Sequence, residues 1–341
     1  MDISIFWVAL NALLPVIAII VLGYGLKRKG FLPDAFLKTG NWLVFYVCFP
    51  AMLFINVYDI DSFAAINWKF VLYCNAMLLV IFIFGMITAI LVTPVGKRRG
   101  VIWQSTFRSN FVILGMAIAG ALGGAEASAL VAVTSSFVIP IFNVLAVVSL
   151  TVFAEEEPGK KQSVGSVLLS TVKNPHVVSI LIGMACLGIR ELQRACFGEV
   201  VFSLREDVKF LYTVLQNITS ITTPFALLVL GGQFVFSAVG GLLKEILTGT
   251  VWRILLSPVL GIGGAWLLSR AGWLSCGSYE YITLLALFAA PAAVASAVMA
   301  TEMGGDEQLA TQIVVWSTLF SAITIFLQVM LLMQLGLLNI V

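Results

Sequence analysis

The chain has 341 residues, of which 60% are hydrophobic and only 11% are charged, and its formal net charge is +2. A soluble globular domain of this length does not need so much apolar surface, so the mean hydropathy of +1.06 excludes the soluble classes. The few charges lie in short clusters between apolar runs, which gives no reason to expect a nucleic-acid partner. The composition therefore indicates an integral membrane protein.

A helix that crosses a bilayer needs about 20 mainly apolar residues. The N-terminal apolar run is long enough to be such a helix, and it lacks the basic leader and small-residue cleavage site of a signal peptide. In chain order, we expect ten membrane-spanning helices, at residues 4–26, 36–57, 69–93, 101–123, 127–153, 176–193, 210–236, 246–269, 280–301 and 309–336.

The positive charges suggest how these spans are oriented. If the first helix runs from outside to inside, eleven lysines and arginines fall in inner loops and six in outer loops. Inner loops of membrane proteins carry the excess of these residues. We therefore expect an integral cell-membrane protein with both termini outside, which is the periplasmic side in a bacterium.

The hydrophilic segment 154–174 divides the spans into a first half, residues 1–153, and a second half, residues 175–341. Five spans in each half place the halves in opposite orientations, which defines an inverted repeat. An Asn followed by a Pro recurs in the second and seventh spans, in NWLVFYVCFPAMLF and NITSITTPFALLVLGG. These positions are candidates for gating or coupling, although the prolines alone can serve to kink helices: Asn41, Pro50, Asn217 and Pro224.

Two apolar segments carry polar or helix-breaking residues where a simple span would not. Residues 103–120, WQSTFRSNFVILGMAIAG, contain Arg108 and Asn110, and a charged side chain in hydrocarbon costs roughly 2.5–3.5 kcal/mol or more. Residues 286–299, ALFAAPAAVASAVM, are interrupted by Pro291, which cannot donate to the carbonyl four residues earlier. Interrupted helices in corresponding places of two halves point to the binding site of a transporter.

These segments give the chain a resemblance to the auxin efflux carrier family, which includes plant auxin exporters and bacterial permeases for malonate and similar acids. The resemblance covers essentially the whole length and depends on the order and spacing of five motifs: NWLVFYVCFPAMLF at 41–54, FRSNFVILGMAIAG at 107–120, KNPHVVSILIG at 173–183, TTPFALLVLGG at 222–232 and APAAVASAVMATEMGGDEQLAT at 290–311.

The resemblance implies an all-α fold of ten helices in two inverted five-helix repeats. It also implies a scaffold of helices 1, 2, 6 and 7, a transport unit of helices 3–5 and 8–10, and a homodimer formed through the scaffold. Helices 4 and 9 would be broken and would cross, as in bile acid symporters and sodium/proton antiporters. A substrate-contacting asparagine is implied at Asn110.

One departure from the family concerns the fourth helix. Plant members have a proline two residues after a glycine that corresponds to Gly115, and this chain has Ala117 there. Pro291 still interrupts the ninth helix. We therefore expect the break in the fourth helix to depend on Gly115 and on tertiary packing, because glycine permits the backbone that a break needs.

Broken helices offer a way to bind an anion. The start of each half-helix presents free N–H groups and a partial positive charge of about +0.5, which can hold a carboxylate. Neutral donors such as Asn110 and Ser296 can complete the site. Gly115, Pro291 and Arg108 are included among the expected substrate-binding positions.

Three charged residues each allow two interpretations. Arg108 either binds a carboxylate or is structural. In the structural interpretation it forms a pair within the protein or reaches the inner interface, because it lies only about 10 Å of helix rise into its span. Arg253, similarly placed near the inner start of the eighth span, allows the same two interpretations, and the structural one is favoured. Glu302 either pairs with one of these arginines or caps its helix, or it takes part in coupling or gating.

The sequence favours a secondary carrier that exports an auxin-like or malonate-like carboxylate by alternating access. An ion-coupled symporter, with sodium or protons, and an anion channel stay open as alternatives. We do not expect an enzyme, a cofactor or a metal site: HExxH and GxxxxGK[ST] motifs are missing, and the only histidine, His176, is expected at the interface. The expected partners are the small organic anion, membrane lipid and a second copy of the chain.

Overall fold

The computed structural model describes residues 3–59, 67–153, 169 and 172–338, and all regular elements among them are helices. The α-helices are α1 (Ile3–Arg28), α2 (Asp34–Leu43), α3 (Phe49–Tyr58), α4 (Trp68–Val92), α5 (Gly96–Phe107), α6 (Met116–Val152), α8 (Pro175–Phe197), α9 (Lys209–Gln233), α10 (Val239–Val251), α11 (Ser257–Arg270), α12 (Ser278–Phe288), α13 (Val294–Glu302) and α14 (Glu307–Gln334). Shorter segments are the π-helical η1 (Val44–Cys48), η2 (Phe111–Gly115) and η4 (Trp252–Leu256), and the 3₁₀-helical η3 (Phe236–Ala238).

Seven helical stretches among the described residues are long and apolar enough to cross a membrane. They correspond to the second, third, fifth, sixth, seventh, eighth and tenth expected spans. The first expected span corresponds to α1, and the fourth and ninth are each divided into shorter helices. The all-helical membrane architecture is therefore confirmed, whereas the count of ten spans and the inverted repeat stay predictions. The connection expected at 154–174 lies mostly outside the described residues.

The long helix α6 consists of two helices that meet at Gly124. This residue has φ 64° and ψ −146°, a conformation that favours glycine. The bend falls between residue 123, the expected end of the fourth span, and residue 127, the expected start of the fifth. α6 therefore contains the last part of the fourth span and nearly all of the fifth.

Two of the π-helical segments end two residues before a proline. η1 precedes Pro50 and η4 precedes Pro258. A proline donates no hydrogen bond, and its ring crowds the carbonyl four residues earlier, which lies inside the π segment in both cases. Local π-helical adjustment is one way in which membrane helices accommodate a proline. This geometry agrees with the interpretation that these prolines shape their helices.

Side chains from other helices satisfy carbonyls in these π segments. Gln328 Nε2 donates to the carbonyl of Ile254 at 2.8 Å, and His176 Nε2 donates to the carbonyl of Phe45 at 3.0 Å. His176 is fully buried inside the protein, in the first turn of α8. Its expected position at the depth of the membrane interface stays a prediction. Its physical role is to satisfy a backbone acceptor that the π segment leaves free.

Small residues allow α1 and α9 to approach closely. A Cβ atom on Gly23 would lie 2.2 Å from the carbonyl oxygen of Leu228, and one on Gly231 would lie 2.1 Å from that of Ile20. Small residues at such positions bring membrane helices into close contact. The crossing of the first and seventh spans is therefore encoded by glycine on both helices.

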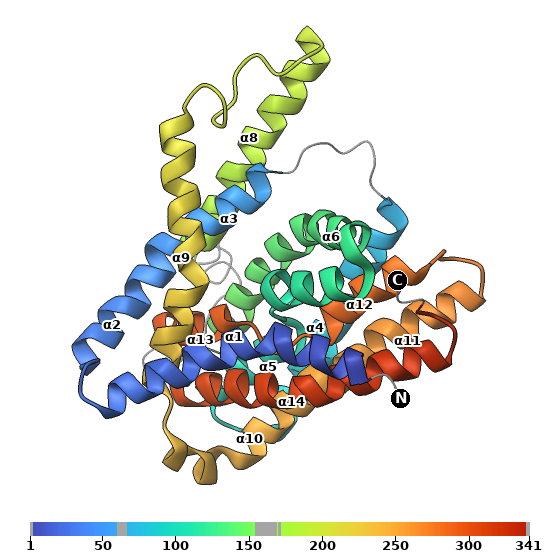
Figure 1. Ribbon diagram of the computed structural model, residues 1–341. Coiled ribbons are helices and arrows are strands. Elements are labelled where there is room, and N and C mark those ends of the chain that lie inside the picture. Colours follow the sequence, from blue (N-terminus) through green and yellow to red (C-terminus); the bar gives the residue numbers. More distant parts are fainter. Residues whose placement is uncertain (1–2, 60–66, 154–168, 170–171, 339–341) are drawn as a thin grey trace.

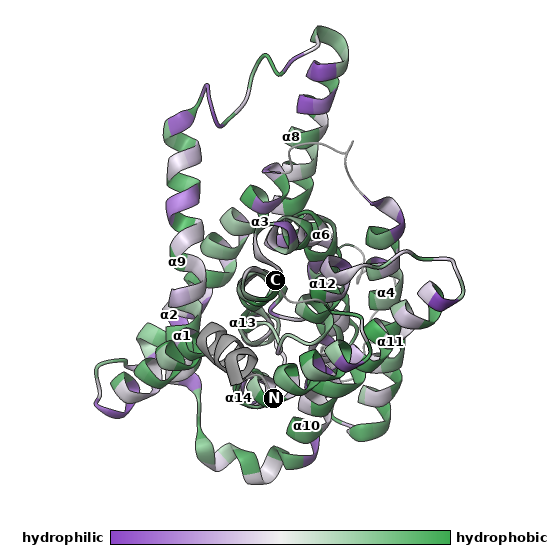
Figure 2. Ribbon diagram, turned by 45° about the vertical axis from the view of Figure 1, so that its right-hand side comes forward, coloured by the Kyte–Doolittle hydropathy of each residue, from purple (hydrophilic) through white to green (hydrophobic). Residues whose placement is uncertain are grey.

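The two short helices α12 and α13 lie in the interior of the bundle. Every α12 residue from Tyr281 to Phe288 is buried, while α8 and α9 form a hairpin that projects beyond the other helices (Figure 1). Hydrophobic residues dominate the long helices, and hydrophilic ones gather at helix ends and loops (Figure 2). This distribution is the one a bilayer requires.

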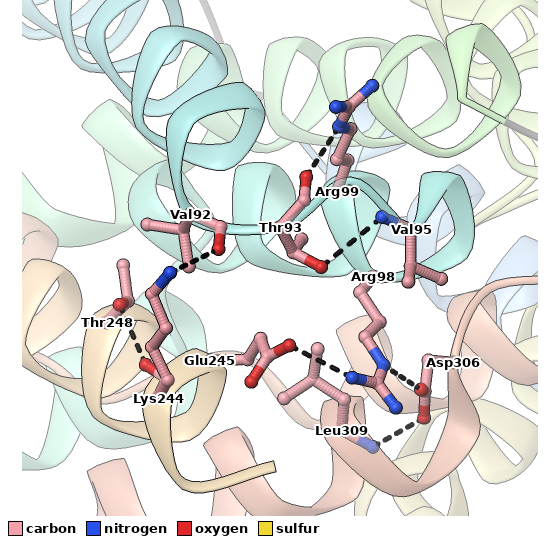
Figure 3. Close-up of polar contacts among 10 residues, drawn as sticks. All are labelled: Val92, Thr93, Val95, Arg98, Arg99, Lys244, Glu245, Thr248, Asp306 and Leu309. Carbon is pink, nitrogen blue, oxygen red and sulfur yellow. Dashed lines mark hydrogen bonds and ion pairs between the residues drawn. The ribbon is translucent and has the colours of Figure 1, made fainter.

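An ion-pair network joins the start of α5 to α10 and α14, ahead of the membrane-spanning part of the fourth span (Figure 3). Arg98 donates to Glu245 at 3.0 Å and to Asp306 at 3.1 Å, and Asp306 caps α14 by accepting from the N–H of Leu309 at 2.9 Å. Burial lowers the pKa of Arg98, but its hydrogen bonds to the two carboxylates and their charges raise this pKa above its ordinary value overall. The network holds the starts of α5 and α14 against the middle of α10.

Candidate functional site

Two helices are interrupted near the centre of the bundle. Residues 108–110 separate α5 from η2, and residues 289–293 separate α12 from α13. An isolated antiparallel β-bridge joins the two extended segments. The N–H of Asn110 donates to the carbonyl of Pro291 at 2.8 Å, and the N–H of Ala293 donates to the carbonyl of Arg108 at 3.2 Å. We call this pair of bonded segments, 108–110 and 289–293, the crossing.

The two interruptions have different physical causes. Proline has no N–H, and the residue before it avoids helical geometry, so Pro291 ends α12 through its own chemistry. No proline lies near residues 108–110, and the extended backbone there is held by hydrogen bonds to the other segment. The break in the fourth span is therefore a tertiary feature.

The expectation that this break depends on Gly115 is wrong. Gly115 has φ −63° and ψ −43°, which is ordinary helical geometry. A Cβ atom there would lie 3.2 Å from Cβ of Ala286 and 2.9 Å from a ring carbon of Phe111. The glycine instead lets the start of α6 pack closely against α12.

A cavity of about 70 Å³ lies against the crossing. The crossing and the starts of the helices that follow it form one wall, part of α6 forms another, and α3 and α9 close the remaining side. The lining residues are Phe49, Met52, Leu53, Arg108, Ser109, Asn110, Phe111, Ile139, Phe142, Asn143, Thr223, Ala226, Ala293, Val294 and Ala295.

Arg108 is the cationic residue of this cavity. Its side chain is buried, and Nη2 donates to Oδ1 of Asn143 at 2.7 Å while Nη1 contacts the sulfur of Met299. The alternative in which Arg108 reaches the inner interface is therefore wrong. Within the described part of the chain, no carboxylate pairs with Arg108. A buried guanidinium without a protein anion is a suitable partner for an anionic ligand.

Two helix starts border the same cavity. Phe111 begins η2, and Val294 and Ala295 begin α13. The first N–H groups of a helix have no partner within the helix, and each start carries a partial charge of about +0.5. The amide of Asn110 lies in the cavity wall beside them and is buried. The structure thus brings together Arg108, Asn110 and both helix starts.

Asn143 completes the polar lining and was not among the expected site residues. Its Oδ1 accepts from Arg108, and its Nδ2 donates to the carbonyl of Ile139 at 2.8 Å within α6. A signal was available in the sequence, because Asn143 is an amide in the middle of the apolar fifth span, three residues after Pro140. A buried polar residue in a span marks a functional position more often than a structural one.

Ser296 lies one residue beyond the cavity lining. Its carbonyl accepts from Nε2 of Gln104 at 2.9 Å, which ties α13 to α5. Its hydroxyl oxygen is buried and has no hydrogen-bond partner among the described residues. Ser296 therefore supports the start of α13 and does not itself line the cavity.

Glu302 and Asn41 lie together at the far end of α13. Nδ2 of Asn41 donates to the Glu302 carboxylate at 2.8 Å and to the carbonyl of Val298 at 3.4 Å. The expectation that Glu302 pairs with Arg108 or Arg253 is wrong, because α2 provides its partner. This contact joins α2 to α13. α2 belongs to the same span as α3, which lines the cavity, and the start of α13 lines the cavity as well.

The remaining expected positions do not reach the cavity. Pro50 lies between lining residues Phe49 and Met52, and both Asn217 and Pro224 are exposed on α9. Thr223, the neighbour of Pro224, does line the cavity. The repeated Asn and Pro positions therefore identify the two helices that close the site, but not the side chains that face it.

Membrane-length helices, a buried cation and two helix starts at one cavity are features expected of a membrane transporter. The comparison with protein families agrees, because residues 8–329 match the family described as membrane transport protein. The chain belongs to this family, the auxin efflux carrier family. A search of curated proteins finds no match to the sequence.

Proposed function

We propose that the protein is a secondary carrier for a small organic anion, and that the anion binds in the cavity beside the crossing. The observation that carries the proposal is the convergence of the Arg108 guanidinium with two helix starts on one buried cavity. Each of these groups attracts a negative charge, and no carboxylate among the described residues pairs with the guanidinium. A carboxylate would supply the missing charge.

The size of the cavity favours a small or occluded ligand. Its volume of about 70 Å³ is far below the roughly 300–1,000 Å³ typical of pockets for drug-sized molecules. A malonate-like acid fits this limit better than an auxin-like acid, which would require the walls to separate. The apolar walls from α3 and α9, including Phe49 and Met52, supply the surface against which such a separation would occur.

We further propose alternating access between two units of the chain. The helices that correspond to spans 1, 2, 6 and 7 form the scaffold, and the remaining helices, with the crossing, form the transport unit. The cavity has walls from both units, so a relative movement would expose it to one side and then to the other. Efflux of an anion is favoured by roughly 2.3 kcal/mol per charge per 100 mV of inside-negative potential.

The cellular placement belongs to the same proposal. We propose that the carrier spans the cell membrane with both termini outside and that it forms a homodimer through its scaffold. The positive-charge distribution supports the orientation, and the family resemblance supports the dimer.

Counterflow into proteoliposomes tests the proposal. Vesicles loaded with an unlabelled acid are diluted into the same acid in labelled form, with malonate and indole-3-acetate as the first pair. We expect saturable exchange of at least one acid. Exchange that never saturates would indicate a channel, exchange that requires a sodium or proton gradient would indicate a coupled symporter, and a chemically altered product would indicate an enzyme.

A further inference from the structure

A second buried arginine lies at the C-terminal ends of α5 and α12, the two helices that lead into the crossing. Arg253, in η4, is fully buried. Its Nη1 donates to the carbonyl of Thr106 at 3.1 Å, and its Nη2 donates to the carbonyl of Phe288. Thr106 is in the last turn of α5, and Phe288 is the last residue of α12. One guanidinium therefore caps the helices that enter the crossing from both sides.

The charge of Arg253 is matched by the backbone. The last carbonyls of a helix have no partner within the helix, and a helix end carries a partial charge of about −0.5. Two such ends together offset one guanidinium. Within the described residues, no carboxylate pairs with Arg253, and an uncompensated charge at this depth would be strongly destabilising.

Arg108 and Arg253 therefore have different electrostatic surroundings. Arg108 borders the cavity beside two positive helix starts, so its surroundings attract an anion. Arg253 lines no part of that cavity and binds two negative helix ends. Ser257 strengthens the second arrangement, because its hydroxyl donates to the same Thr106 carbonyl at 2.5 Å.

We propose that Arg253 is a fixed cation that offsets the two negative helix ends at the crossing. The inference rests on the proposed function, and it adds a residue outside the cavity on which binding of the anion depends. Arg253 is a positioning residue: it holds the ends of α5 and α12 in place, and it balances their charge, so that the helix starts in the cavity can bind the anion.

Variants that separate charge from packing test this proposal in the full-length protein. Arg253→Lys keeps the charge, and Arg253→Gln keeps hydrogen-bond donors but loses the charge. We expect Arg253→Lys to retain exchange within roughly tenfold of the unsubstituted protein and Arg253→Gln to lose roughly 100-fold, as expected for removal of a compensated buried charge. Equal exchange by the two variants, or better exchange by Arg253→Gln, would overturn the proposal.

Rescue by a free cation provides a readout that is specific to the position of Arg253. Arg253→Ala opens a space beside the two carbonyls, and we expect guanidinium chloride at low millimolar concentration to raise its unfolding temperature and its exchange rate in a saturable way. Arg99→Ala is the matched control, because Arg99 donates to one carbonyl, that of Thr93, away from the crossing. The same response in both variants would contradict the proposal.

Failure of this inference can be distinguished from failure of the proposed function. If the carrier exchanges none of the acids tested, the proposed function fails. The unfolding temperatures of Arg253→Ala, Arg253→Lys and Arg253→Gln with and without guanidinium still decide whether a fixed cation is needed at the crossing.

Discussion

Asn110 contributes to the crossing and to the cavity through different atoms. Its backbone N–H donates to Pro291 and holds the two extended segments together, whereas its side chain lies in the cavity wall. A substitution of the side chain leaves the backbone bond in place. Binding and folding can therefore be separated at this residue.

We expect Asn110→Ala to reduce exchange by roughly 10–100-fold, the value of one or two hydrogen bonds to a charged group, with little change in unfolding temperature. Counterflow and a thermal-shift measurement on the same preparation check this. Asn75→Ala is the control, because the Asn75 amide donates to the carbonyl of Val71 within α4. A parallel loss of folding in Asn110→Ala would make the residue structural.

Arg108 provides the full positive charge of the cavity. We expect Arg108→Gln to raise the KM for the acid by roughly 100-fold while the protein still folds, because the variant keeps a donor for Asn143 but loses the charge. Concentration-dependent exchange measures KM and the maximal rate separately. Arg99→Gln, which removes a guanidinium outside the cavity, should leave both values unchanged. An unaltered KM in Arg108→Gln would exclude Arg108 from binding.

At the scale of elements, α11 positions the end of α12 through one glycine. A Cβ atom on Gly261 would lie 2.3 Å from the ring of Phe288, the residue whose carbonyl binds Arg253. Gly263, two residues along the same helix, faces open space, because a Cβ atom on it would meet nothing within 4 Å. The pair offers a matched comparison of close packing and open space.

We expect Gly261→Ala to destabilise the protein by about 1–3 kcal/mol, because the Phe288 ring must move, and Gly263→Ala to have little effect. Unfolding temperatures of the two variants in the same detergent compare them directly. Similar temperatures would show that the α11–α12 contact tolerates a shift of the ring. A selective loss in Gly261→Ala would show that the end of α12 is held rigidly.

The interrupted elements also show what a sequence can reveal. Pro291 predicts its interruption because its effect is local: it removes an N–H and constrains its neighbour. Residues 108–110 have no such local signal, and their conformation depends on bonds to residues that lie more than 180 positions away. The apolar spans could be predicted from the sequence for the same reason as the interruption at Pro291, since hydropathy is a local property.

The residues of the candidate site could be predicted only in part from the sequence. Arg108 and Asn110 were identified because polar residues are costly in an apolar span. Asn143 carried the same signal but lay in a helix that no motif singled out, and the partner of Glu302 could not be inferred because side-chain pairs between α2 and α13 depend on tertiary packing. The sequence therefore predicted the part of the cavity around Arg108 and Asn110 better than the walls formed by α3, α6 and α9.

At the scale of the molecule, the Asn41–Glu302 contact crosses the proposed boundary between scaffold and transport unit. Asn41 belongs to α2 of the scaffold, and Glu302 ends α13 of the transport unit. If the units move during transport, this contact must break in each cycle. A covalent link at the same place should then stop the cycle.

We expect a cross-link between Asn41→Cys and Glu302→Cys, in a background without the five natural cysteines, to abolish most exchange and a reductant to restore it. The control pair is Gly40→Cys with Val229→Cys, which joins α2 to α9 inside the scaffold, where a Cβ on Gly40 would lie 3.0 Å from Cγ2 of Val229. Undiminished exchange by the cross-linked Asn41–Glu302 pair would exclude movement at this boundary.

The Asn143 amide accepts a hydrogen bond from Arg108, so a single substitution at Asn143 can change the charge of the ligand that the cavity prefers. Asn143→Asp would place a carboxylate beside the guanidinium and form an ion pair within the protein. We expect this variant to exchange malonate poorly and to favour an uncharged analogue such as malonamide, which competition counterflow would measure. A single substitution outside the crossing would then change the charge of the ligand that the proposed carrier accepts, while the architecture stays the same.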